Sequence, residues 1–160
     1  MSIEKVRDYF RPLGREGDIL EFPVSSATVE LAAQAVGVIP ARIAKTLSFL
    51  VDGSCVIIVA AGDAKIDNSK FKGFFHTKAK MLTPEQAVEM TGHAVGGVCP
   101  FANPEGVRTY LDVSLRRFDT VFPAAGSSSS AIQLTCDELA EYSHSLEWVD
   151  LCKGWQEEEN

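Results

Sequence analysis

The amino-acid sequence predicts a single α+β domain built on a mixed, largely antiparallel β-sheet with surrounding helices. Three observations lead to this class. The 160 residues amount to about one folding unit, and neither a repeat nor an interdomain linker divides them. Hydrophobic residues make up 46% and charged residues 23%, which is typical of globular proteins and excludes disordered, collagen-like and coiled-coil chains. Helix patterns and strand patterns follow one another along the chain.

The first 40 residues predict two amphipathic helices around a short strand. Apolar residues recur at helical spacing over residues 3–13 and again over residues 29–36. Ser25 or Ser26 is the expected N-cap of the second helix, because a serine hydroxyl accepts hydrogen bonds from the N–H groups of a first helical turn. Residues 19–24 are expected to form the strand between the two helices.

A β-hairpin is predicted at the centre of the chain. Apolar residues alternate from Ile43 to Val51, and Asp52-Gly53 is a common two-residue hairpin turn. Residues 55–61 form the returning strand. We therefore expect an antiparallel pair at the centre of the sheet.

The second half of the chain predicts shorter elements. Thr83 and Thr135 each begin a capping-box spacing, in which a threonine is followed three residues later by Gln or Glu. The helices are expected at residues 67–75, 84–91 and 136–142. The strands are expected at residues 80–82, 109–113, 120–122, 132–134 and 148–151. One domain should cover residues 1–156, and residues 157–160 should form an acidic frayed tail.

The charge is unevenly distributed. The net charge is −7, and residues 137–160 alone hold eight acidic residues against one lysine. The rest of the chain is balanced, with a lysine-rich segment over residues 65–80 that contains Lys65, Lys70, Lys72, Lys78 and Lys80. This segment could meet a phosphate backbone, although such runs are more often a solvated face. No apolar run long enough for a membrane span occurs, so we expect a cytoplasmic protein with no membrane partner.

The cysteines give no sign of a metal site. Four are present, without CxxC spacing or a nearby histidine pair, so we expect reduced thiols and no metal or cofactor. Cys99 follows His93 by six residues, which permits a Cys/His nucleophilic pair. Nothing in the sequence supplies the third group that would orient such a pair.

Three further features have both a functional and a structural interpretation. Lys45 is in phase with the apolar residues of its strand, so it lies either at the lip of a pocket or at a strand end that reaches water. The loop over residues 96–101 is either a backbone cradle for a ligand or a tight turn. The small residues at 124–130 form either an anion nest or a serine-rich hairpin turn.

The order of four segments resembles a known family. These segments are RIAKTL at 42–47, VGGVCPF at 95–101, YLDVSL at 110–115 and AGS at 125–127. Together they are similar to the YbaK/ProX family of free-standing aminoacyl-tRNA deacylases, which is related to the editing domain inserted in bacterial prolyl-tRNA synthetases. The resemblance spans about residues 20–142, and it implies the α+β editing-domain fold.

The resemblance also implies a reaction and a site. The reaction is hydrolysis of the ester that joins a wrong small amino acid to the terminal ribose of tRNA, without a metal or a covalent intermediate. Lys45 would hold the terminal phosphate or ribose, and the backbone of Gly96 and Pro100 would position the amino group, the carbonyl and the attacking water. The remaining expected substrate-binding residues are Gly97, Val98, Cys99, Asp112, Gly126 and Ser127. Asp112 would either pair with Lys45 or fix its strand.

The expected partner is a mischarged tRNA, most simply tRNA-Pro carrying Ala, Cys, Ser or Thr, with no DNA partner. The lysine-rich segment could receive the acceptor stem, and help from prolyl-tRNA synthetase is a hypothesis that rests on the acidic net charge. Two alternatives stay open. One is a non-catalytic module that binds aminoacyl-tRNA or a nucleotide, and the other is a thiol-dependent hydrolase that uses Cys99.

Overall fold

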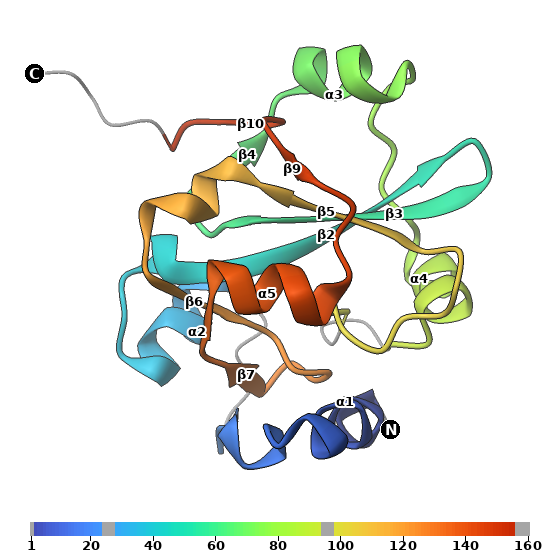
Figure 1. Cartoon of the computed structure of the whole chain (residues 1–160). Coiled ribbons are helices and arrows are strands. Elements are labelled where there is room, and N and C mark those ends of the chain that lie inside the picture. Colours follow the sequence, from blue (N-terminus) through green and yellow to red (C-terminus); the bar gives the residue numbers. More distant parts are fainter. Residues whose placement is uncertain (1, 24–27, 94–97, 156–160) are drawn as a thin grey trace, which may run out of the picture.

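A six-stranded mixed sheet forms the centre of the protein (Figure 1). The computed structural model describes residues 2–23, 28–93 and 98–155. In spatial order the strands are β8 (Leu134–Thr135), β6 (Thr120–Pro123), β2 (Ile43–Val51), β3 (Ser54–Ala61), β5 (Arg108–Asp112) and β9 (Trp148–Val149). The predicted hairpin is confirmed as the long antiparallel pair of β2 and β3. The pairs β2–β6, β3–β5 and β5–β9 run parallel, and β6–β8 is antiparallel.

Two small antiparallel sheets join segments that are distant in sequence. β1 (Ile19–Glu21) pairs with β7 (Ser130–Ile132), and β4 (Lys65–Ile66) pairs with β10 (Cys152–Lys153). Residues 80–82, predicted as a strand, contribute only a single bridge between Met81 and Phe49. The prediction was too long here because the segment turns directly into a helix at residue 84.

The helices are α1 (Ser2–Phe10), α2 (Val29–Val36), α3 (Asn68–Phe75), α4 (Pro84–Thr91) and α5 (Cys136–Ser143). Short 3-10 helices occupy Arg11–Leu13, Glu16–Asp18, Pro40–Arg42 and Val113–Arg117. Both predicted capping boxes are present, at the start of α4 and of α5. The N-cap of α2 is Thr28, whose hydroxyl accepts from the N–H of Leu31, and not Ser25 or Ser26, which lie outside the described residues.

The sheet is covered on both faces. Phe10 of α1 and Leu139 of α5 pack on one face in a fully buried cluster that also contains Phe101. Phe71 and Phe75 of α3 pack on the other face. A third cluster, Ala33, Ile43, Phe122 and Ala131, fixes α2 beside the junction of β2 and β6. Within the described residues, no helix combines the length and the apolar character that a bilayer crossing requires.

Candidate functional site

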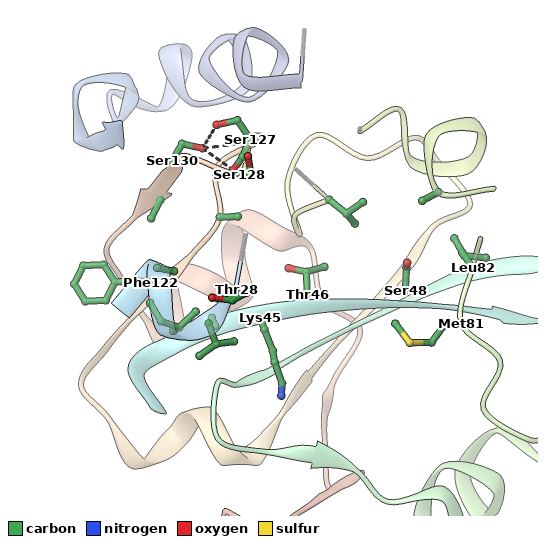
Figure 2. A pocket seen from close by; sticks show the side chains of 18 of the residues that line it. Thr28, Lys45, Thr46, Ser48, Met81, Leu82, Phe122, Ser127, Ser128 and Ser130 are labelled. Atoms are coloured by element: carbon green, nitrogen blue, oxygen red, sulfur yellow. Dashed lines mark hydrogen bonds between the residues drawn. The ribbon is translucent and has the colours of Figure 1, made fainter. Parts of the chain in front are cut away.

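A cavity of about 340 Å³ opens beside β2 (Figure 2). This volume lies in the range that small-molecule sites occupy in proteins. Its wall comes from β2, the starts of α2 and α4, Val98, the end of β6 and the serine-rich turn after it. The lining residues are Thr28, Val29, Ala32, Ile43, Ala44, Lys45, Thr46, Ser48, Met81, Leu82, Thr83, Pro84, Ala87, Val98, Phe122, Ala124, Ser127, Ser128, Ser130 and Ala131. The described part of the wall is therefore apolar with several hydroxyls, one lysine and no carboxylate.

The edge of β2 that borders the cavity is interrupted. β6 pairs with Ile43 and Ala44, and farther along the same edge the N–H of Leu82 donates to the carbonyl of Ser48 at 3.1 Å. Alternate residues of a strand direct their backbone groups to the same edge, so Thr46 directs its N–H and C=O to this one. No strand pairing among the described residues reaches Thr46 on that edge. Within the described residues, the backbone N–H and C=O of Thr46 therefore have no strand partner on this edge.

Lys45 lies at the border of the cavity, with its ammonium held on the far side of β2. Figure 2 shows its side chain leaving the strand opposite to Thr46 and Ser48. The ammonium donates to the carbonyl of Ala64 and, at 3.4 Å, to the carbonyl of Gly62. The side chain is half-buried. Of the two alternatives that the sequence left open, a pocket lip and a strand end that reaches water, the structure shows part of each: Lys45 is among the residues that line the cavity, while its ammonium is directed away from it.

The electrostatic state of Lys45 follows from its burial. Removal from water lowers the pKa of Lys45 below its ordinary value, and Lys65 acts in the same direction, while Cys152, Asp63 and Glu30 oppose it. A partly desolvated ammonium gains more from an approaching anion than an exposed one does, because less water screens the pair. The position therefore favours a phosphate or another anionic group.

Hydroxyls line the opposite wall of the cavity. The serine-rich turn is held by a hydrogen bond of 2.9 Å between the hydroxyls of Ser127 and Ser130, and the N–H of Ser127 also donates to Ser130. Gly126, just before it, is buried and has a φ of 103°, a conformation that side chains rarely allow. Of the two predicted residues here, Ser127 lines the cavity and Gly126 shapes the turn behind it.

The predicted loop is described only at its end. Gly96 and Gly97 lie outside the described residues. Val98 lines the cavity, whereas Cys99 and Pro100 are buried behind it. His93 Nε2 lies 2.9 Å from the carbonyl of Phe101 and 3.7 Å from Cys99 Sγ. This histidine therefore ties the chain before the loop to the chain after it.

Cys99 is poorly placed to act as a nucleophile. Burial raises the pKa of its thiol to about 12, although the carbonyl of Phe101 and Lys5 oppose the shift. At neutral pH the thiol is therefore protonated, and a thiol is a far weaker nucleophile than a thiolate. The completely buried side chain also has no access to a substrate.

We accordingly expect Cys99→Ser to retain most of the ester-hydrolysing activity proposed below. Alkylation with iodoacetamide should likewise leave the wild type active, because the reagent needs an accessible thiolate. Both are checked by the rate at which amino acid is released from mischarged tRNA, with circular dichroism to confirm folding. A folded Cys99→Ser protein without activity would instead support the thiol-dependent hydrolase.

Asp112 lies outside the cavity wall, in the buried core at the end of β5. One carboxylate oxygen accepts the N–H of Ser114 at 2.9 Å, and the other accepts the N–H of Leu151 at 2.8 Å. The nearby Cys152 thiol has its pKa raised to about 12, chiefly by burial and then by Asp112. The geometry favours the strand-fixing interpretation of Asp112 over a pair with Lys45.

The lysine-rich segment is largely exposed. Lys65, Lys72, Lys78 and Lys80 are exposed on β4, α3 and the chain that leads to α4. Lys70 differs, because its ammonium donates to Asp150 at 2.9 Å and to the carbonyl of Cys152 at 3.2 Å. Lys80 directly precedes Met81, which lines the cavity. The exposed lysines therefore extend from the border of the cavity over α3.

Several residues that line the cavity were not predicted from the sequence. Thr46 and Ser48 share the strand face opposite to Lys45, and alternating small polar residues on an expected core strand could have indicated them. Thr83 and Pro84 were recognised only as the start of a helix. No set of three or more His, Cys, Asp or Glu side chains able to hold a metal occurs in the ranges 2–23, 28–93 and 98–155.

A match to a protein-family model shows the family of the chain. The model of a family described as the aminoacyl-tRNA editing domain matches residues 24–142, which include the lining part of β2, Val98 and the serine-rich turn. The chain belongs to this family. The resemblance that rested on residues 42–47, 95–101, 110–115 and 125–127 is thereby confirmed.

Similar proteins agree with this editing-domain family. YwhH of Bacillus subtilis (strain 168), an uncharacterized protein, is 56% identical over 157 residues, covering 98% of this chain and 100% of YwhH. Proline–tRNA ligase of Leuconostoc citreum (strain KM20) is 28% identical over 127 residues, covering 72% of this chain and 22% of the ligase. The crystal structure of a candidate trans-editing enzyme for prolyl tRNA synthetase matches with a TM-score of 0.86 and 28% identity, covering 96% of this chain and 98% of that one. The editing-domain chain thus spans about a fifth of the ligase it resembles.

Proposed function

We propose that this editing-domain protein is a trans-acting aminoacyl-tRNA deacylase that hydrolyses the ester of tRNA-Pro carrying a wrong small amino acid. The observation that carries the proposal is a cavity bordered by Lys45, Val98 and Ser127, three positions at which the family likeness expects substrate. The likeness to a candidate trans-editing enzyme and to proline–tRNA ligase supports tRNA-Pro as the substrate. The predicted roles of Gly96, Gly97 and Pro100 remain part of this proposal.

The cavity and Lys45 bind different parts of the substrate. The small aminoacyl group enters the cavity, whose wall is apolar with hydroxyls, and Lys45 binds the phosphate or ribose of the terminal adenosine at its border. The ammonium already has two carbonyl acceptors in Gly62 and Ala64, so its position is fixed before substrate arrives. A preorganised cation costs little reorganisation when charge develops nearby.

The chemical step needs only positioning and water. A water oxygen attacks the ester carbonyl, the bond to the ribose oxygen breaks, and the products are the free amino acid and a tRNA with its terminal hydroxyl restored. Backbone N–H groups at the interrupted edge of β2 and in the loop before Pro100 would stabilise the developing oxyanion. An aminoacyl ester is an activated ester, so oriented dipoles and effective concentration suffice without a catalytic triad.

The direct test measures amino acid released by the wild type from tRNA-Pro charged with Ala, Cys, Ser, Thr or Pro. Release from at least one mischarged tRNA, with Pro-tRNA-Pro spared, is the expected result. A control with heat-inactivated protein corrects for spontaneous hydrolysis. Binding of these tRNAs without release from any of them would replace the proposal by the non-catalytic binding module.

The exposed lysines provide a prediction about tRNA binding. We expect the double variant Lys78→Ala/Lys80→Ala to bind tRNA more weakly and with a shallower salt dependence, the slope falling by about 1 for each lysine that contacts a phosphate. Filter binding between low and moderate salt measures this slope. Lys70→Ala is the matched comparison and should change the slope less, because Asp150 already neutralises that ammonium. Equal slopes for the double variant and the wild type would exclude these two lysines from the tRNA interface.

A further inference from the structure

Thr46 lines the cavity and carries an unsatisfied polar group, its hydroxyl. Its Oγ1 atom is buried and makes no hydrogen bond within the described part of the chain. The residue itself is half-buried and lines the cavity, and its side chain rises from β2 on the same side as Ser48 (Figure 2). Buried hydroxyls are almost always hydrogen-bonded, because an unpaired one loses its water without compensation. A site that retains one is prepared for a partner.

The other polar side chains of the cavity restrict which kind of ligand group can bond the Thr46 hydroxyl. The hydroxyls of Ser127 and Ser130 bond each other, and the ammonium of Lys45 is held by carbonyls on the other side of β2. None of the described lining residues is acidic, so this part of the wall offers no counter-ion to a cationic side chain. A threonine hydroxyl can donate and accept at the same time, as can another hydroxyl. The group that complements Thr46 is therefore small, uncharged and hydrogen-bonding.

We infer that Thr46 is a specificity-determining residue, and that the aminoacyl group selected by this cavity carries a side-chain hydroxyl, as serine and threonine do. This inference rests on the proposed function. Such a substrate supplies the missing partner of Thr46, whereas alanine leaves the hydroxyl unpaired. Sites built to hydrogen-bond a substrate hydroxyl discriminate strongly against the analogue that lacks it, because the unpaired group of the protein then counts against binding.

The test compares Thr46→Val with Thr46→Ser. Valine has nearly the shape of threonine without the hydroxyl, and serine keeps the hydroxyl. We expect Thr46→Val to lower the ratio of kcat/KM for Ser-tRNA-Pro to kcat/KM for Ala-tRNA-Pro by at least about tenfold. Thr46→Ser should keep the preference of the wild type. Thr109→Val is the matched control, because Thr109 is a buried threonine of β5 that does not line the cavity; it should leave the ratio of the two substrates unchanged.

Thermal unfolding gives a second readout that a purely structural threonine would not produce. Because Thr46→Val removes an unpaired buried hydroxyl, its Tm should rise above that of the wild type. A threonine that served packing or a hydrogen bond in the fold would instead lower the Tm when replaced. A higher Tm combined with a lost preference for serine would mean that the hydroxyl is kept for the substrate at a cost in stability.

The other possible outcomes overturn either the proposed function or the role of Thr46. A wild type that hydrolyses no mischarged tRNA overturns the proposed function and this inference with it. An active wild type whose serine-to-alanine ratio is unchanged in Thr46→Val overturns the inference alone. An equal fall in kcat/KM for both substrates would mean that Thr46 binds a group that all aminoacyl esters share. That result also overturns the selection of a side-chain hydroxyl.

Discussion

Replacement of Lys45 by alanine should abolish most of the deacylation, with a loss of at least about 100-fold in kcat/KM, comparable to the removal of one preorganised donor from other hydrolytic sites. The variant loses the ammonium that the carbonyls of Gly62 and Ala64 hold on the far side of β2, and that we assign to the terminal phosphate or ribose. The fold should persist, because a half-buried charge is removed from a strand whose pairing with β3 involves only backbone groups. Release of amino acid from the best mischarged tRNA measures the effect.

Two further variants show whether the loss comes from Lys45 itself. Lys153→Ala removes an exposed lysine of β10, and it should keep full activity. Lys45→Arg keeps the charge but replaces a compact ammonium by a planar fork, which fits the two carbonyls of Gly62 and Ala64 poorly, so we expect only partial activity. Full activity of a folded Lys45→Ala protein would remove this lysine from the site.

Replacement of Asp112 by alanine should lower the free energy of unfolding by about 3 kcal/mol, since two buried N–H groups lose a charged acceptor. Those groups belong to Ser114 and Leu151, so the change loosens both the turn after β5 and the C-terminal segment. Urea unfolding followed by circular dichroism measures the difference. Asp112→Asn keeps one acceptor oxygen and should fall between the wild type and Asp112→Ala.

The same two variants separate the two interpretations of Asp112. If the carboxylate only fixes the strand, the folded fraction of each variant hydrolyses substrate at nearly the rate of the wild type. A large loss of kcat in Asp112→Asn without a loss of stability would instead place Asp112 in the chemistry. Activity must be measured well below the unfolding temperature, where the weakened proteins are still folded.

The elements with local signals were predictable from the sequence. The hairpin follows from the alternation over residues 43–51, and its turn residues Asp52 and Gly53 adopt the positive φ values that such a turn requires. Both capping boxes are local patterns and occur where expected. The parallel pairing of β2 with β6 joins residues about 80 positions apart, and no local pattern encodes it. The cap of α2 was misplaced because the segment before Thr28 offers several hydroxyls.

The site residues show the same contrast between local sequence signals and properties of the folded sheet. Lys45 could be noticed because a charge among apolar residues conflicts with the burial that the pattern predicts. The unpaired state of the Thr46 hydroxyl could not be predicted, because threonine is common in strands and the hydroxyl is unusual only in lacking a hydrogen-bond partner among the described residues. The gap in backbone pairing beside Thr46 likewise depends on where β6 stops and where residues 80–82 begin to bond β2, which is a property of the assembled sheet.

The interrupted edge of β2 also bears on how such a cavity can change its substrate over evolutionary time. Mutation replaces side chains and leaves the main chain chemically the same, so under the proposed function the N–H and C=O of residue 46 would serve the amino and carbonyl groups that every aminoacyl ester has in common. The surrounding side chains then carry only what differs between one amino acid and another. A few side-chain substitutions around the interrupted edge of β2 can therefore change which amino acid is selected, while the backbone groups that would bind the ester stay the same.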